Sequence, residues 1–182
     1  MKKLIAFLLI ASSLYSDSQE DAKIYLGTSY GYLNESFSDS EYDDMSAQTA
    51  KIKIGYGIRS SYAVELSLEY TQKDKDVFST NDGDRLGMNL EVMKGFDWDI
   101  YVNPFFKAGF GAGYLDIDNS QNSSLSFSSY NLGIGCFIPV NEHLDFELGY
   151  SYKFTSYEKI EEGDKELNSN VNIAYIGVNF RF

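Results

Sequence analysis

The chain has 182 residues and a formal net charge of −12 at pH 7, and it is rich in aromatic residues, with 15 Tyr and 13 Phe beside 15 Gly. This length, with two Pro and no long polar linker, predicts a single domain. Cys136 is the only cysteine, which excludes disulfides and cysteine-based metal sites within the chain, and the acidic balance argues against nucleic acid as a partner, since phosphate binding needs clusters of Lys and Arg.

The first residues have the pattern of a secretory signal peptide. Lys2 and Lys3 give a basic start, an apolar run follows over 4–10, and small residues come next. The apolar run is shorter than the roughly 20 residues that a membrane-spanning helix needs, which disfavours an uncleaved anchor. We therefore expect residues 1–16 to be a signal peptide, with the cleavage position defined to within a few residues, and residues 17–182 to be the mature domain.

The mature chain begins with a short polar segment and then alternates apolar and polar residues. In the run 23–34, one face carries apolar and aromatic side chains and the other carries glycine and polar residues. A period of two residues is the pattern of a β-strand with two different faces. The segment 35–47 that follows is acidic, and we expect it to be a loop.

The next two runs, 48–58 and 62–72, have the clearest alternation and are separated by the short segment 59–61, which predicts a tight hairpin. A turn centred on Ser60 would place Lys51 opposite Glu69. Favourable pairs of opposite charge across neighbouring strands support this register. The same register would place Lys53 diagonally from both Glu65 and Glu69.

The rest of the chain repeats this organisation. Further strands are expected at 85–94, 100–115, 127–138, 143–155 and 171–182, with short connections at 95–99 and 139–142 and long connections at 73–84, 116–126 and 156–170. The longest run contains Gly109-Phe-Gly-Ala-Gly113, which lacks the spacing of a nucleotide-binding loop. We interpret these glycines as space for bulky neighbours on the same face.

Eight strands joined alternately by long acidic loops and short turns predict an all-β fold, an eight-stranded antiparallel up-and-down transmembrane β-barrel. In a membrane the strands must close into a barrel, because no backbone group can be left unpaired there. The even number of strands would place both termini on the periplasmic side and the long loops outside.

Aromatic residues on the apolar face lie near the predicted strand ends, where they would form two girdles at the membrane interfaces. Those toward the long loops are Tyr32, Tyr70, Tyr114, Tyr130 and Phe154, and those toward the short turns are Tyr62, Phe146, Phe180 and Phe182. A soluble barrel would instead pack its apolar side chains inward around a core or a ligand, and this remains the alternative architecture.

The C-terminal strand ends in a specific motif formed by Tyr175, Gly177, Phe180 and Phe182. This spacing resembles the terminal-strand signal of bacterial outer-membrane barrels, which implies recognition by the barrel-assembly machinery. The whole mature chain resembles the small eight-stranded outer-membrane β-barrel family, which includes the transmembrane domain of outer-membrane protein A and outer-membrane protein X. The resemblance implies residence in the bacterial outer membrane, in contact with its lipid and lipopolysaccharide.

Charged residues on the opposite face of the predicted strands would point into the lumen. They are Lys51, Lys53, Glu65, Glu69, Arg85, Glu91, Lys107, Asp145, Glu147, Lys153 and Arg181. The basic and acidic members nearly balance, so we interpret them as a network of paired charges that fills a narrow lumen, in preference to an ion path. Tyr25, Phe105, Phe137 and Tyr175 are also expected to point inward and obstruct a pore.

No catalytic, cofactor or metal site is predicted. His143, the only histidine, falls at a predicted periplasmic turn, and Asp116-Ile-Asp118-Asn119 lacks the later Gly and Glu of a calcium loop. The leading hypothesis is a non-enzymatic outer-membrane protein with a structural role or a surface-interaction role through its acidic external loops, whose ligand the sequence does not identify. A small porin-like channel or transporter is the second hypothesis, and a secreted soluble ligand-binding barrel is a distant third.

Overall fold

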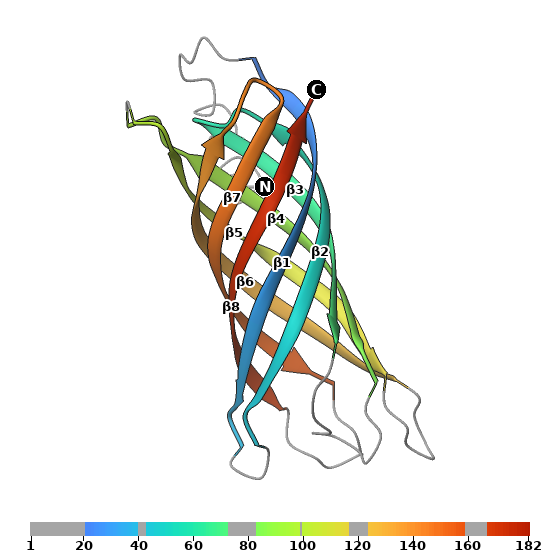
Figure 1. Ribbon diagram of the computed structural model, residues 1–182. Helices are drawn as coiled ribbons and strands as arrows, with labels where there is room; N and C mark the ends of the chain where they lie inside the picture. The colour runs from blue at the N-terminus through green and yellow to red at the C-terminus, as the bar shows by residue number, and fades with distance from the viewer. Residues whose placement is uncertain (1–20, 40–42, 73–82, 99, 117–123, 159–166) are drawn as a thin grey trace, which may run out of the picture.

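The computed structural model describes residues 21–39, 43–72, 83–98, 100–116, 124–158 and 167–182. These residues form one closed barrel of eight antiparallel strands in sequence order, in which β8 pairs with β1 (Figure 1). The strands are β1 (Lys23–Phe37), β2 (Met45–Gly57), β3 (Tyr62–Gln72), β4 (Arg85–Gly95), β5 (Asn103–Asp116), β6 (Ser124–Pro139), β7 (Leu144–Tyr157) and β8 (Asn168–Arg181). No helix long and apolar enough to cross a membrane occurs in this part of the chain.

All eight predicted strands are present, but several predicted boundaries are wrong. β1 continues through Glu35 and β2 begins at Met45, so the predicted loop 35–47 is shorter at both ends. β6 and β8 also begin before the predicted residues, and β5 begins at Asn103 instead of residue 100. The prediction followed the apolar alternation, whereas the backbone ladder continues past the apolar belt, where outward side chains such as Ser46 and Asn170 are polar.

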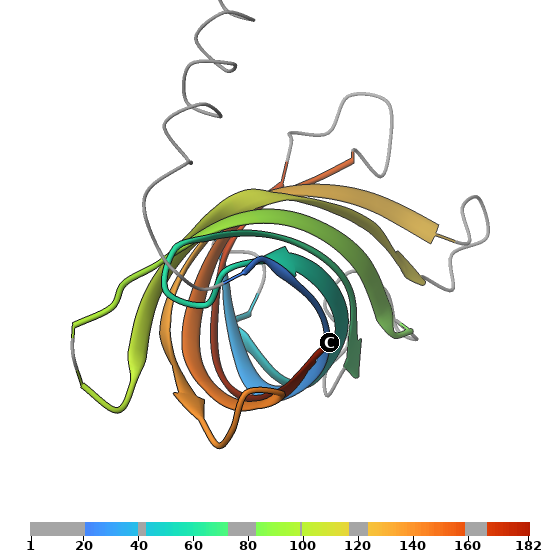
Figure 2. The same cartoon turned by 90° about the horizontal axis from the view of Figure 1, so that it is seen from above.

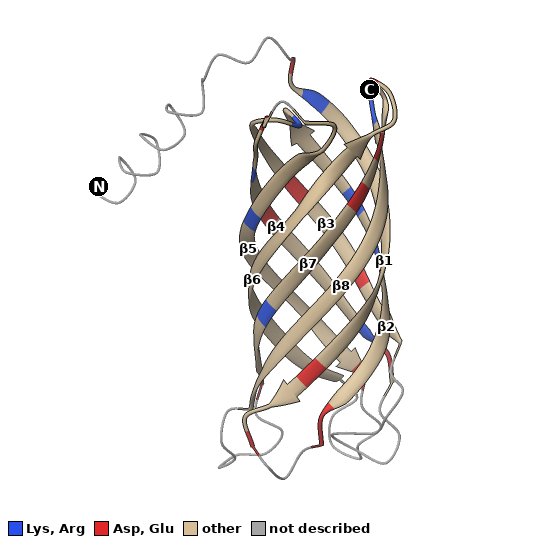
Figure 3. Cartoon of the chain, turned by 60° about the vertical axis from the view of Figure 1, so that its left-hand side comes forward, with Lys and Arg blue, Asp and Glu red and all other residues tan. Residues whose placement is uncertain are grey.

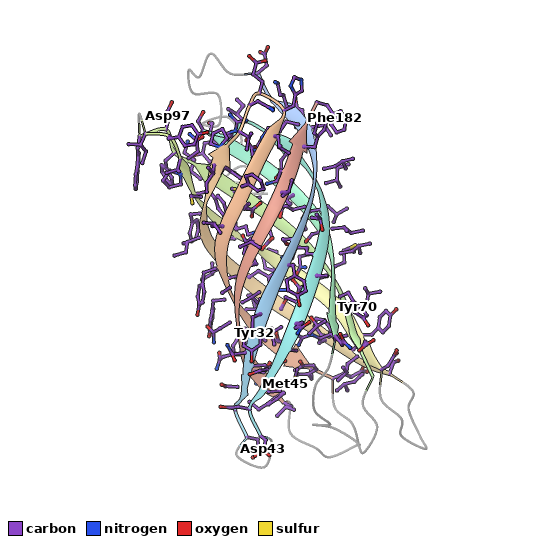
Figure 4. All side chains as sticks on the ribbon, in the orientation of Figure 1. Tyr32, Asp43, Met45, Tyr70, Asp97 and Phe182 are labelled. Atoms are coloured by element: carbon purple, nitrogen blue, oxygen red, sulfur yellow. The ribbon has the colours of Figure 1, made fainter. Side chains whose placement is uncertain are left out.

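Burial alternates residue by residue along the strands, as a barrel in lipid requires. On β2, Ile52 is 62 % exposed whereas the neighbouring Lys53 is 5 % exposed. Most apolar side chains therefore face outward (Figure 4), whereas the predicted charge network, part of the charged positions that Figure 3 marks along the strands, faces the lumen. This arrangement is the reverse of a soluble barrel. Most of the strands exceed the roughly 9 to 11 residues needed to cross the hydrocarbon layer.

Inward aromatic rings lie over glycines of the neighbouring strands. Tyr25 is directly opposite Gly55, and Tyr175 is directly opposite Gly149. A Cβ atom added to either glycine would overlap the tyrosine ring. The prediction for the glycine-rich run of β5 is confirmed at Gly113, where an added Cβ would lie 2.7 Å from the ring of Phe127.

The two ends of the barrel differ. One end, the turn end, carries the connections 58–61, 96–102 and 140–143 together with both ends of the described barrel (Figure 1). The backbone N–H of Phe182 donates to the carbonyl of Ile24 at this end, with 2.9 Å between N and O. The opposite end, the loop end, carries the other four connections, most of whose residues lie outside the described part of the chain.

Candidate functional site

The lumen is the candidate site, because its charged side chains are the chemically distinctive feature of the fold. The structure places every residue of the predicted charge network on the inner face, and each is at most 9 % exposed. These residues do not form one continuous column. They form separate groups at different depths, joined by polar side chains and divided by apolar ones.

The central group joins five charged side chains from five strands. The ammonium of Lys53 lies 3.1 Å from a carboxylate oxygen of Glu65 and also contacts Glu147 across the lumen. Lys107 lies 3.5 Å from Glu65 and 3.4 Å from Glu91. Each carboxylate in this group therefore has a nearby cation, which compensates much of the cost of burying the charges.

Two inward tyrosines complete the hydrogen bonds of this group. The hydroxyl of Tyr25 donates to Glu65 with an O to O distance of 3.1 Å, and that of Tyr175 donates to Glu147 at 2.9 Å. The side-chain amide of Asn179 also donates to Glu147, at 2.9 Å. The rings that obstruct the lumen thus also hold its carboxylates in place.

A second group lies toward the loop end, around Glu69. Lys51 is directly opposite Glu69 in the register of β2 and β3, which confirms the position predicted from a turn at Ser60. Its ammonium lies 3.2 Å from one oxygen of Glu69, and Lys153 from β7 lies 2.5 Å from the other. Of the two diagonal contacts predicted for Lys53, the one with Glu65 is an ion pair. Glu69 instead has Lys153 as its second partner.

Uncharged side chains continue this group around the inner wall. The ammonium of Lys153 lies 3.3 Å from the amide oxygen of Asn89, which also accepts a hydrogen bond from Asn131 at 2.9 Å. Ser129 donates to Asn131 at 2.8 Å. The middle of the lumen is therefore crosslinked by hydrogen bonds between strands that are not neighbours.

At the turn end, Asp145 is held between two arginines. Its carboxylate lies 2.7 Å from the guanidinium of Arg59 and 2.5 Å from that of Arg181. The Arg181 guanidinium also lies over the ring of Tyr25, with 4.8 Å from Cζ to the ring centroid. Sequence reasoning assigned Arg59 to a hairpin turn and missed its role in this group.

At the loop end, Glu35 forms the corresponding ionic group. It lies 2.9 Å from Arg85 and accepts hydrogen bonds from Tyr157 at 2.6 Å and Ser169 at 2.5 Å. The sequence analysis placed Glu35 in the first acidic loop, which is wrong, since it is 1 % exposed inside the barrel. Its odd number continues the inward series of β1, and this was the signal that could have found it.

Apolar clusters separate these ionic groups. One cluster near the turn end contains Tyr25, Ala63, Met93, Phe105 and Phe137. Two more occupy the loop end, formed by Leu33, Met45, Ala47, Val171, Ile173 and Tyr175, and by Leu115, Leu125 and Tyr157. The predicted inward aromatics thus belong to larger apolar layers, most of whose aliphatic members sequence reasoning missed.

The remaining chemically reactive residues do not converge on the lumen. His143 lies in the turn 140–143, where its ring packs 6.1 Å from that of Phe180, measured between centroids. Cys136 is half-buried on the outer face of β6. No group of three or more His, Cys, Asp or Glu side chains suited to a metal ion occurs among the residues that the structure places.

The residues of the predicted assembly signal lie on both faces of β8. Tyr175 points into the lumen and Gly177 pairs with Ser29 of β1. Phe180 and Phe182 point outward, with their rings 5.0 Å apart in an edge-to-face arrangement. Recognition of this strand by assembly factors stays a prediction.

Comparison with known proteins adds independent information on the family. The sequence-family model of the outer membrane protein β-barrel domain matches residues 4–182 of the chain. A comparison of the sequence with curated proteins found no match.

Solved structures with this fold have low sequence identity to the chain. Neisserial surface protein A is 17 % identical, with a TM-score of 0.69 over 90 % of this chain and 100 % of that one. OprG from Pseudomonas aeruginosa is 18 % identical, with a TM-score of 0.56 over 91 % and 99 %. Ail from Yersinia pestis is 17 % identical, with a TM-score of 0.54 over 87 % and 98 %. At these identities the three structures show the fold alone.

The first prediction contrasts two lumen charges. Asp145→Asn should lower the free energy of unfolding by about 3 kcal/mol, because it leaves the buried Arg181 and the half-buried Arg59 without a carboxylate. Lys51→Gln should cost only about 1 kcal/mol, because Glu69 keeps Lys153 as a partner. Urea titration of the folded protein in lipid vesicles, followed by heat-modifiable gel mobility, measures both. Equal losses for the two variants would contradict the assigned pairings.

The second prediction concerns the C-terminal residue. Deleting Phe182 should lower the yield of folded protein in the outer membrane far more than shortening the connection 38–44, because loop length changes stability only slightly. The control deletion must stay within 38–44, since β1 and β2 extend to its borders. Heat-modifiable mobility of membrane fractions measures both yields, and equal yields would remove the assigned role of Phe182.

Proposed function

Since the chain belongs to the outer membrane protein β-barrel domain family, and so to the bacterial outer membrane, we propose that it is a non-enzymatic barrel that stabilises the envelope and presents acidic external loops to other molecules. The alternative of a secreted soluble barrel does not fit membership of an outer-membrane family. An outward face that includes Ile52, Phe110 and Ile134, each more than half exposed, needs lipid to cover it.

The filled lumen is the observation that carries this proposal. Its charges are paired within the barrel, and apolar clusters occupy the lumen toward both ends. An eight-stranded barrel has an interior just wide enough for side chains. Moving an ion through it would require breaking pairs such as Arg181 with Asp145 and Lys153 with Glu69.

The proposed orientation places the turn end and both termini in the periplasm and the loop end outside. The outward apolar belt would contact outer-membrane lipid. Between the apolar belt and the loops, most outward residues carry hydroxyl or amide side chains. There the hydroxyl of Tyr150 donates to Asn172 at 2.6 Å, and that of Tyr152 donates to Asn170 at 2.5 Å. Such neutral polar groups suit the sugars of lipopolysaccharide in the outer leaflet.

A small channel is the second candidate, favoured by the polar belt of Asn89, Asn131 and Ser129 in the middle of the lumen. The apolar clusters on either side oppose it, because they offer an ion no replacement for its hydration shell.

The third prediction separates these two functions. In planar bilayers, the purified wild-type protein should show little stable conductance, because side chains fill the lumen. The double variant Phe105→Ala/Phe137→Ala, which removes two stacked rings with centroids 4.8 Å apart, should increase brief current fluctuations. Large, steady, ion-selective currents from the wild-type protein would establish the channel instead.

The charge of the loop end indicates the chemistry of a surface partner. Asp43, Asp44, Asp84, Asp116 and Glu158 border the connections there, and acidic residues outnumber basic ones in the sequence of the loops. Figure 3 shows red, acidic segments at this end of the barrel, next to the connections. The fold neighbour Ail has been solved with sucrose octasulfate, a heparin analogue. A polyanion of that kind would be repelled here, so we propose a cationic partner, or one held through bridging cations.

The fourth prediction tests this surface charge. Vesicles of neutral lipid containing the protein should bind polylysine and should not bind heparin. The double variant Asp44→Asn/Glu158→Gln should bind polylysine more weakly, and the difference should vanish at 1 M salt, where the screening length falls to about 3 Å. Lys23→Gln, a charge change at the opposite end, is the control and should leave binding unchanged. Heparin binding by the wild-type protein would refute the proposed charge preference.

A further inference from the structure

The connection between β4 and β5, of which the structure describes residues 96–98 and 100–102, is an exposed aromatic projection on the barrel wall. Figures 1 and 2 agree that it extends sideways from the barrel instead of continuing along its axis. Trp98, Ile100 and Tyr101 are 62 %, 54 % and 72 % exposed. Such apolar exposure at a connection is unexpected in water, and nothing in the proposed function uses it.

The base of this projection is held by defined hydrogen bonds. The backbone N–H of Gly95 donates to the carbonyl of Ser61 in the neighbouring turn at 2.5 Å, and that of Phe96 donates to Pro104 at 2.9 Å. The Asn103 side-chain amide lies 3.5 Å from the carbonyl of Phe96. The projection is therefore directed by the barrel framework on both sides.

Lys94 lies beside the projection and is unusual in the chain. It faces outward from β4, whereas every other Lys or Arg within the described strands occupies the inward-facing register. Its ammonium lies 4.1 Å from the ring centroid of Tyr62 and 5.9 Å from that of Phe96. The ammonium is thus held at the edge of the apolar belt nearest the turn end, close to two aromatic rings.

We propose that Lys94, Tyr62, Trp98 and Tyr101 form a phospholipid-binding site, in which Trp98 and Tyr101 insert at the membrane interface and Lys94 binds the lipid phosphate. Trp and Tyr favour this interface because their rings are amphipathic, and Lys extends its ammonium toward the headgroups. With the orientation proposed above, the lipid belongs to the inner leaflet of the outer membrane.

Two features favour lipid over a periplasmic protein as the occupant. The projection is continuous with the outward apolar face of β5, where Phe106 and Phe110 are exposed. The projection also extends sideways at the level where the strands end, as the labelled Asp97 shows (Figures 1 and 4). A protein partner would be met more readily beyond the end of the barrel.

Trp98 is the only tryptophan in the chain, so its fluorescence reports on this site alone. The full protein is folded into phosphatidylcholine vesicles whose acyl chains carry bromine near the headgroup or near the chain end. Emission should be blue-shifted relative to the urea-unfolded chain and quenched most by the shallow bromine. Emission that bromine leaves unchanged and that iodide quenches as in the unfolded chain would place Trp98 in water and overturn the proposal.

A second experiment tests the phosphate contact. Native mass spectrometry of the protein from phosphatidylglycerol-containing micelles counts retained lipids. Lys94→Gln should weaken retention about fivefold, the effect of one cation near an anionic surface. Lys23→Gln removes the same charge at the same end of the barrel, away from the projection, and should change retention little. Equal effects of the two variants, with both proteins folded by heat-modifiable mobility, would refute a specific site at Lys94.

Discussion

The structure depends on one constraint, which is that every backbone N–H and C=O group within the membrane must find a partner inside the protein. The pairing of β8 with β1 meets it by closing the sheet, so no strand edge remains. Closure also determines the two environments of each strand. Even-numbered residues such as Ile52 face lipid, and odd-numbered residues such as Lys53 face a narrow interior.

The narrow interior in turn explains the character of the lumen. A charge enclosed there is costly unless an opposite charge and hydrogen-bond donors or acceptors surround it. Asp145 meets this need with two arginines, Glu69 with two lysines, and Glu147 with Lys53, Tyr175 and Asn179. Because some of these partners come from strands that are not neighbours, such as Lys53 of β2 for Glu147 and Lys153 of β7 for Glu69, the charges crosslink the barrel wall. In the proposed function, the residue types that would suit a transport path fill the lumen instead.

The outer surface changes along the barrel axis, so the two ends suit different surroundings. The loop end has neutral polar side chains above the apolar belt and acidic residues at its connections. The turn end has Lys94 held against Tyr62, with the exposed Trp98 beside it. Both surfaces fit the proposed function, in which the loop end meets external molecules and the turn end lies in the inner leaflet.

The sequence by itself determined the existence of eight strands, the face on which each side chain lies and the pairing of Lys51 with Glu69. These depend on a period of two and on a tight turn, which are local properties of the chain. Only the tertiary structure decided that Lys53 reaches Glu147, that Arg59 reaches Asp145 and that Glu35 is buried against Arg85. Contacts across a lumen depend on the diameter of the barrel and the stagger of its strands, which emerge only when the sheet closes. The strand ends escaped prediction for a related reason: the apolar alternation stops at the edge of the lipid, whereas the hydrogen-bonded ladder continues beyond it.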